Sequence, residues 1–114
     1  MATDQELITQ TFQDYFESWS DADVARTDRA LHPDLVTRSP AEDGGAILAK
    51  ELMLPACAES EGARTADRWM KIDIADVCGG IASAVGRSVP YREYLRLIRT
   101  GDGWKIADAL WLPR

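Results

Sequence analysis

Three ionisable side chains of this sequence could carry proton-transfer chemistry: His32, Glu93 and Asp108. His32 is the only histidine in the chain, and histidine is the side chain best suited to moving protons near neutral pH. It stands before Pro33 at the expected end of a helix, where a ring that bonds backbone carbonyls or meets the helix dipole is the commoner outcome. His32 is therefore a catalytic candidate with a structural alternative.

The two carboxyl candidates fall on predicted strands in the last quarter of the chain. Glu93 shares a strand face with Leu95 and Leu97, whose type favours the core, so we expect Glu93 to point inward at the mouth of a pocket. Burial beside aromatic rings would raise its pKa and let it act as an acid or a base. Asp108 could pair with Arg96 on a neighbouring strand, but such pairs are more often surface ion pairs.

Aromatic side chains supply much of the apolar surface, and most of them should pack in the core. A fold that brings the first helix against the last strands would leave some of them lining a pocket. Alternation along the last strand places Trp104 and Trp111 on opposite faces, and a β-bulge would change that assignment. The candidate substrate-binding residues are Trp19, Trp69, Tyr94, Trp104 and Trp111.

Length and composition indicate one soluble globular domain spanning 1–114. The chain has 114 residues, 46% of them hydrophobic, and 13 Lys and Arg against 19 Asp and Glu give a net charge of −6. This length allows a core without disulfide staples. The acidic balance disfavours nucleic-acid or anionic-membrane partners, which need a basic patch. No apolar run could span a bilayer, and MATDQE lacks a signal-peptide pattern, so we expect a cytoplasmic protein.

Metal and cofactor motifs are not evident in the sequence. One histidine and no Cys-x-x-Cys pair disfavour zinc. The Gly-Gly steps at 44–45 and 79–80 lack the context of a phosphate-binding loop. Cys57 and Cys78 are expected to be reduced thiols, although the sequence leaves a disulfide open. We therefore expect no cofactor and no metal.

The first third of the chain has the period of helices. Apolar residues repeat at helical spacing over 3–19, and Thr3 and Glu6 have the spacing of a capping box at its start. A second helix is expected over 22–31, and Pro33 ends it. These helices should cover one side of whatever the later residues form.

Beyond Pro33 the sequence predicts a short extended segment over 35–39 and a third helix over 46–54 that Pro55 ends. From residue 67 the period changes to two, which is typical of strands. Gly86 marks a bulge or bend in the second strand of this antiparallel meander. Helices followed by a meander indicate an α+β fold, with N-terminal helices packed in a strongly curved antiparallel sheet. The expected strands of the meander cover 67–77, 81–89, 91–100 and 104–112.

Two stretches carry a family likeness: YFESWSDADVARTDRALHPDLV and YREYLRLIRTGDGWKIADALW. Their Leu-His-Pro-Asp step, Tyr-x-Glu-Tyr-Leu strand and Gly-x-Trp-Lys-Ile closing strand resemble the nuclear-transport-factor-2-like superfamily. Within it the chain is most similar to the lumazine-binding and SnoaL-like members, over nearly its whole length. The resemblance implies a cone-shaped α+β fold with a deep apolar pocket, often dimeric through the outer face of the sheet.

The resemblance also bears on chemistry. Tyr15 matches the tyrosine that steroid-isomerase-like members place on the oxyanion side. The position of their carboxylate base holds Ser39, and that of the second donor falls at Leu95, so that isomerase constellation is incomplete here. Since the fold hosts isomerases, dehydratases, epoxide hydrolases, cyclases and noncatalytic binders, the resemblance does not decide the reaction.

From these signals we predict a small cofactor-independent pocket enzyme of the cyclase, dehydratase or isomerase type, acting on a hydrophobic ring-containing small molecule. Two alternatives stay open: a noncatalytic small-molecule-binding protein, and a dimeric interaction module that uses the outer sheet face. The resemblance implies a homodimer through that face. The candidate catalytic residues are Tyr15, His32, Glu93 and Asp108.

Overall fold

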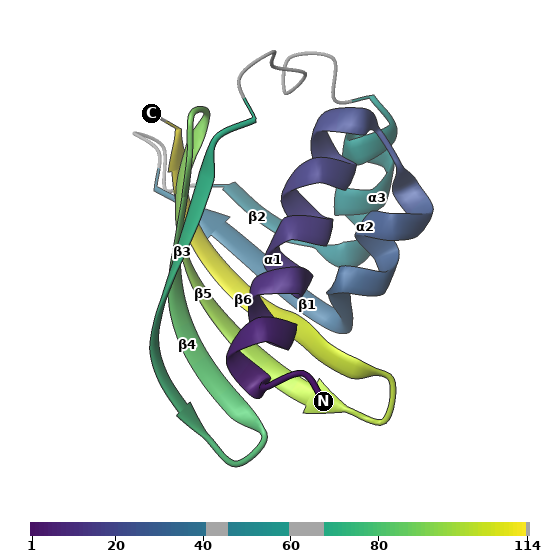
Figure 1. Ribbon diagram of the computed structural model, residues 1–114. Helices are drawn as coiled ribbons and strands as arrows, with labels where there is room; N and C mark the ends of the chain where they lie inside the picture. The colour runs from purple at the N-terminus through teal and green to yellow at the C-terminus, as the bar shows by residue number, and fades with distance from the viewer. Residues whose placement is uncertain (41–45, 60–67, 114) are drawn as a thin grey trace.

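Helices begin the chain, and a curved sheet is built mostly from its second half. The computed structural model describes residues 1–40, 46–59 and 68–113 (Figure 1). The elements are α1 (Asp4–Asp21), α2 (Val24–Ala30), β1 (Leu31–Ser39), β2 (Ala46–Ala49), α3 (Lys50–Ala58), β3 (Met70–Cys78), β4 (Ile81–Ser88), β5 (Tyr91–Thr100) and β6 (Gly103–Pro113).

The strands form one sheet in the order β2-β1-β6-β5-β4-β3, with the helices on one of its faces (Figure 1). Neighbouring strands are antiparallel except for the parallel pair β1 and β6. The sheet curves around α1, so that the helix lies in its concave side. This arrangement confirms the predicted α+β fold of helices packed in a curved sheet.

Helix α1 forms close to its predicted bounds because its start and its buried face are both encoded locally. Thr3 and Glu6 make the predicted capping box, in which the Thr3 hydroxyl accepts from the Glu6 N–H at 3.1 Å. Ile8 and Phe12, one turn apart, are fully buried in the core. The amphipathic pattern therefore translates directly into the packing of α1 on the sheet.

Helix α2 is shorter than predicted at both ends. Ala22 adopts the left-handed conformation with a φ of 55°, which ends α1 and separates it from α2. The Asp23 carboxylate then caps α2 by accepting from the Arg26 N–H at 3.1 Å. β1 follows at once from Leu31, four residues before the predicted extended segment.

Helix α3 departs from the predicted third helix. The first four residues of that prediction instead pair with β1 as the edge strand β2, and α3 continues through Pro55. A proline within a helix removes a backbone hydrogen bond and normally kinks or ends it. Met53 and Cys57 are buried on either side of Pro55. The prediction that Pro55 ends the helix is therefore wrong, and this packing supplies the physical reason.

Phe12 of α1 packs directly over Gly86 of β4. A Cβ atom on Gly86 would lie 2.6 Å from the Phe12 ring, far inside contact distance. Gly86 keeps regular pairing with β3 and β5, so the prediction of a bulge at this residue is wrong. The glycine instead allows the close approach of helix and sheet.

A β-bulge in β6 decides which of its side chains face the helices. Consecutive residues of β5 pair with Asp108 and Ile106 of β6, so Ala107 is the extra residue. A bulge shifts the alternation of the residues beyond it by one. Trp104 and Trp111 consequently both face the helices, whereas simple alternation placed them on opposite faces. Asp108 turns to the outer face, which none of the three described helices covers.

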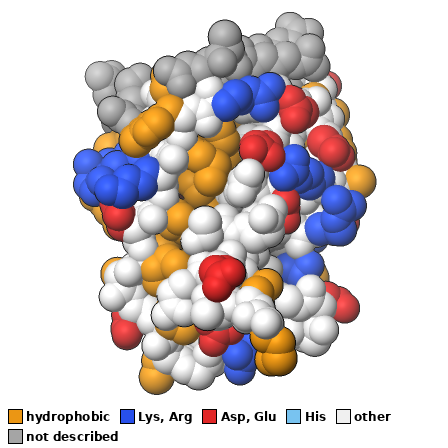
Figure 2. Space-filling view, viewed as in Figure 1, with side chains coloured by type: hydrophobic (Ala, Val, Ile, Leu, Met, Phe, Trp, Pro, Cys, Tyr) orange, Lys and Arg blue, Asp and Glu red, His pale blue; other side chains and the backbone are white. Residues whose placement is uncertain are grey.

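Charged side chains of both signs are interspersed over the helical side of the molecule (Figure 2). Arg26 of α2 forms ion pairs with Asp14 and Glu17 of α1, each at 2.9 Å. Within the described ranges, no helix is long and apolar enough to cross a bilayer.

Candidate functional site

A cavity of about 110 Å³ lies between the helices and the sheet, beside the start of β5. Residues from α1, α3 and four strands contribute to its wall, so the cavity exists only in the folded chain. Most of the side chains that line it are apolar or aromatic. They are Tyr15, Trp19, Thr37, Leu48, Met53, Ala56, Tyr91, Glu93 and Trp111.

Tyr15 and Glu93 meet in this wall because of how α1 is placed on the sheet. Glu93 of β5 pairs with Gly86 on one side and with Trp111 on the other. Phe12 sits over Gly86, and Tyr15, three residues further along α1, therefore lies over Glu93. The Tyr15 hydroxyl donates a hydrogen bond to Glu93 Oε1 at 2.9 Å. Two of the four predicted catalytic residues are thus brought into direct contact.

Burial controls the ionisation of this pair. Only 6% of the Glu93 surface is exposed, and burial raises the pKa of its carboxyl from 4.5 to about 7, against the lowering effect of the Tyr15 hydrogen bond. Burial, and then the neighbouring Glu93 carboxylate, raises the pKa of Tyr15 well above 10. Near neutral pH, Glu93 is therefore poised between its two protonation states, while Tyr15 remains a hydroxyl donor.

Aromatic rings form much of the remaining wall. The Tyr91 and Trp111 rings meet edge to face, with centroids 5.6 Å apart and planes at 88°. Burial, and then the Glu93 charge, raises the pKa of Tyr91, so its hydroxyl also stays neutral. Thr37 contributes a hydroxyl that already donates towards the Leu48 carbonyl at 3.5 Å.

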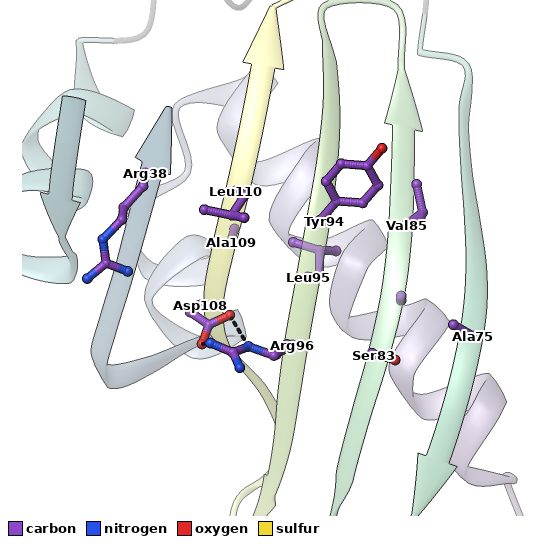
Figure 3. Close-up of a pocket in the computed structure, with 11 residues that line it drawn as sticks. Arg38, Ala75, Ser83, Val85, Tyr94, Leu95, Arg96, Asp108, Ala109 and Leu110 are labelled. Atoms are coloured by element: carbon purple, nitrogen blue, oxygen red, sulfur yellow. Dashed lines mark hydrogen bonds and ion pairs between the residues drawn. The ribbon is translucent and has the colours of Figure 1, made fainter. Parts of the chain in front are cut away.

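The other two predicted catalytic residues lie elsewhere. His32 Nδ1 accepts a hydrogen bond from the Asp34 N–H at 3.0 Å, near the start of β1 and outside the cavity lining. Asp108, on the outer face of the sheet, holds Arg96 through contacts of 2.8 and 2.7 Å (Figure 3). The fold separates both residues from the Tyr15–Glu93 pair.

Of the five predicted ligand-contacting aromatics, Trp19 and Trp111 line the cavity and three do not. Trp104 is buried at another part of the core, where its indole Nε1 donates to Asp4 at 3.1 Å. Trp69 is half exposed. Tyr94 is also half exposed, on the outer face.

Five lining residues were missed by the sequence analysis as site residues. Tyr91 could have been found, because it lies two positions before Glu93 on the same strand and therefore shares its face. The other four come from β1, β2 and α3, whose placement depends on long-range packing. They are Thr37, Leu48, Met53 and Ala56.

Metal-ligating groups do not gather in the part of the chain that the structure describes: no three His, Cys, Asp or Glu residues are placed to hold an ion there. Cys57 and Cys78 are free thiols, the first buried and the second exposed. Cys57 Sγ lies 3.2 Å from the Thr27 hydroxyl and helps to join α3 to α2. The donor set at the cavity is one carboxyl, three hydroxyls and aromatic rings.

The sequence family described as "Putative lumazine-binding" matches residues 3–112. The chain belongs to this family. The match spans almost all of the chain and includes every element that contributes to the cavity wall. No curated protein matches the chain.

Solved structures described as NTF2-like or cystatin-like have the same fold as this lumazine-binding family member. An NTF-2-like protein of unknown function from Silicibacter pomeroyi is 16% identical, with a TM-score of 0.75 over 100% of both chains. An NTF2-like protein of unknown function from Methylobacillus flagellatus is 14% identical, with a TM-score of 0.73 over 100% of this chain and 95% of that one. A domain of unknown function with a cystatin-like fold from Nostoc punctiforme is 11% identical, with a TM-score of 0.68 over 100% and 80%. These likenesses show that the fold is shared, and the fold alone does not identify a function.

Proposed function

We propose that this chain binds a small organic molecule in the cavity and that Glu93, assisted by Tyr15, transfers a proton on it. One observation carries the proposal: a buried carboxyl, hydrogen-bonded by a tyrosine at 2.9 Å and with a pKa raised by burial to about 7, lines a cavity. A group whose pKa lies near the ambient pH is the most effective general acid or base. This supports a cofactor-independent isomerase, dehydratase or cyclase.

The proposed step begins with the Glu93 carboxylate. It takes a proton from a substrate carbon next to an electron-withdrawing group, and the electron pair of the broken C–H bond moves towards that group. Protonated Glu93 then returns the proton to a different substrate atom, so the protein ends as it began. Tyr15 holds the carboxylate in place through its hydroxyl, which stays protonated because burial raises its pKa well above 10.

The size of the cavity limits the substrate. An apolar cavity of about 150 Å³ can hold benzene, and this one has about 110 Å³. The part of the ligand that reaches Glu93 is therefore no larger than a single small ring or a group of similar size. A ring-containing substrate fits the proposal if the rest of the molecule extends through the opening.

Solvent deuterium incorporation tests the proposal. A panel of small cyclic and open-chain ketones would be incubated with the protein in heavy water, and exchange at the carbon next to the carbonyl would be followed by NMR. We expect exchange with at least one ketone and a rate lower by about 100-fold or more in Glu93→Gln. Glu51→Gln, an exposed change on α3, should leave the rate unaltered.

The outcomes separate the parts of the proposal. Binding of ketones without exchange in the wild-type protein would refute the catalytic role and retain the binding role. No binding of any ketone would refute the proposed proton transfer on a ketone. Equal exchange rates in Glu93→Gln and the wild type would show that Glu93 and Tyr15 do not carry out the proton transfer.

A noncatalytic binding protein is the second candidate. It is favoured by the placement of His32 and Asp108 outside the cavity, which leaves the neutral Tyr15 hydroxyl as the partner of Glu93 from the four predicted catalytic residues. The aromatic wall would then serve to stack on and bury a ligand. Retained binding in Glu93→Gln, with no exchange in either protein, is the result that this candidate predicts.

The outer face of the sheet supports a homodimer. Tyr94, Leu110 and Leu112 are about half exposed on it. An open groove of about 530 Å³ crosses this face between Arg38 and Ala75 (Figure 3). We propose that two copies pair through this face around a two-fold axis. A single domain of 1–114 and a cytoplasmic location belong to the same proposal.

A further inference from the structure

The charges around the cavity have one sign. Glu93 can be negative, Tyr15 and Tyr91 are neutral near pH 7, and the lining that the structure describes contains no lysine, arginine or histidine. The hydrogen bond that Glu93 receives within the described residues comes from a neutral hydroxyl. A buried carboxylate without an opposite charge is costly. A cation in the cavity would supply that charge.

The aromatic walls favour the same kind of ligand. Ring faces carry partial negative charge and attract cations that approach within about 6 Å of the ring centre, most strongly where water is excluded. Four lining side chains are aromatic. Two of them, Tyr91 and Trp111, meet at 88° and so form two walls at right angles.

The rest of the lining does not suit calcium or magnesium as the cation. These ions need about six oxygen ligands, whereas the described wall offers one carboxyl and three hydroxyls among apolar groups such as Leu48, Met53 and Ala56. An organic ammonium ion carries its own methyl or methylene groups, which can pack against such a wall. Its charge is also spread over a larger, less hydrated surface.

We propose that the ligand of this cavity carries a small organic ammonium group, held between the Glu93 carboxylate and the surrounding aromatic rings. This inference rests on the proposed function, since it names the ligand class of the same site. A bound cation also favours the ionised form of Glu93, which is the form that accepts a proton. The ionised form of Glu93 would repel an anionic ligand.

The pH dependence of binding distinguishes a cation from a neutral ligand. The titratable groups that face Glu93 are Tyr15 from α1 and Tyr91 from its own strand, while Cys57 of α3 acts on Tyr15. Both tyrosines stay neutral at pH 6 to 8, because burial raises their pKa values above 10. A cation should bind better as Glu93 ionises with rising pH, and a neutral hydrogen-bond acceptor should bind worse.

Tetramethylammonium chloride, with tert-butanol as its neutral counterpart of similar shape, provides the test. The indole N–H signals of the four tryptophans would be followed by NMR at constant ionic strength. Trp19 and Trp111 line the cavity, whereas Trp69 and Trp104 lie outside it and serve as internal controls. We expect tetramethylammonium to shift the first two signals and to bind about tenfold more tightly at pH 8 than at pH 6.

The variants extend the test to the residue that carries the inference. Glu93→Gln should weaken tetramethylammonium binding by about tenfold at pH 8 and remove its pH dependence, while Glu51→Gln should change neither. The inference is overturned if tert-butanol binds as tightly as tetramethylammonium at pH 8, or if the affinity for the cation is the same at both pH values. If tert-butanol shifts the cavity signals and the cation does not, the binding function stands and the ammonium inference falls. If neither shifts them, both fail.

Discussion

Glu93 combines three properties that rarely occur in one carboxyl group. It lies in the wall of a cavity, it is almost completely buried, and it is hydrogen-bonded by a buried tyrosine hydroxyl. Burial raises the pKa of the carboxyl from 4.5 to about 7. Such strongly shifted groups concentrate at functional sites, because the same burial that lowers stability makes the group useful in proton transfer.

The raised pKa of Glu93 makes stability depend on pH. Between about pH 4.5 and 7 the folded state holds this proton while the unfolded chain has released it, so the contribution of Glu93 to the free energy of unfolding falls as the pH rises. In Glu93→Gln this loss is absent. Between pH 5 and pH 8 we expect the free energy of unfolding of the variant to rise relative to that of the wild type, by on the order of 3 kcal/mol at most. Urea denaturation at a series of pH values measures this difference. If the difference in the free energy of unfolding between the two proteins stayed constant with pH, the raised pKa of Glu93 would be contradicted.

At the scale of secondary-structure elements, the contact between α1 and β4 sets the geometry of the site. Phe12 occupies the space that a side chain at Gly86 would need. Tyr15 follows on the same helix, and Glu93 is the neighbour of Gly86 across the sheet. A shift of α1 would therefore separate the Tyr15 hydroxyl from the carboxyl that it contacts.

Gly86→Ala tests this contact. The new methyl group would collide with the Phe12 ring, and overpacking of this kind costs about 1–3 kcal/mol. Gly80→Ala is the matched control, because its Cβ would have Arg99 Cβ as its nearest neighbour at an ordinary 3.8 Å. Thermal denaturation should show a clear loss of stability only for Gly86→Ala. Equal melting temperatures for the two variants would mean that α1 can move away without penalty.

At the scale of the whole molecule, the two faces of the sheet have different surroundings. The concave face holds the helices and the cavity, and the opposite face presents Tyr94 and Leu110 to solvent (Figure 3). The bulge at Ala107 produces this division in β6, since it sends Trp111 inward and Asp108 outward. In the proposed homodimer the outer face is covered while the cavity stays accessible.

Sedimentation equilibrium would test the homodimer. We expect the wild-type protein to sediment as a dimer and Tyr94→Glu to sediment as a monomer, because pairing would bury the new negative charge in the proposed interface. Ala25→Glu adds the same charge at an exposed position of α2 and should remain dimeric. A monomeric wild type at micromolar concentration would refute the proposed pairing.

The sequence by itself was enough for features that depend on near neighbours along the chain. The capping box of α1 and the bounds of β5 both follow from local spacing along the chain. The inward face of Glu93 was also accessible, because alternation links it to Leu95 and Leu97, which are buried. The family likeness added Tyr15, although not its contact with Glu93.

Only the tertiary structure decided what depends on contacts between distant residues. Packing of Met53 and Cys57 carries α3 through Pro55, and a single extra residue at Ala107 reverses the faces of the last strand. The same long-range packing brings Tyr15 to Glu93 and leaves His32 and the other candidates outside. Local patterns indicate which side chains prefer burial. The size of the cavity and the groups that contact a buried carboxyl are decided only when separate elements pack together.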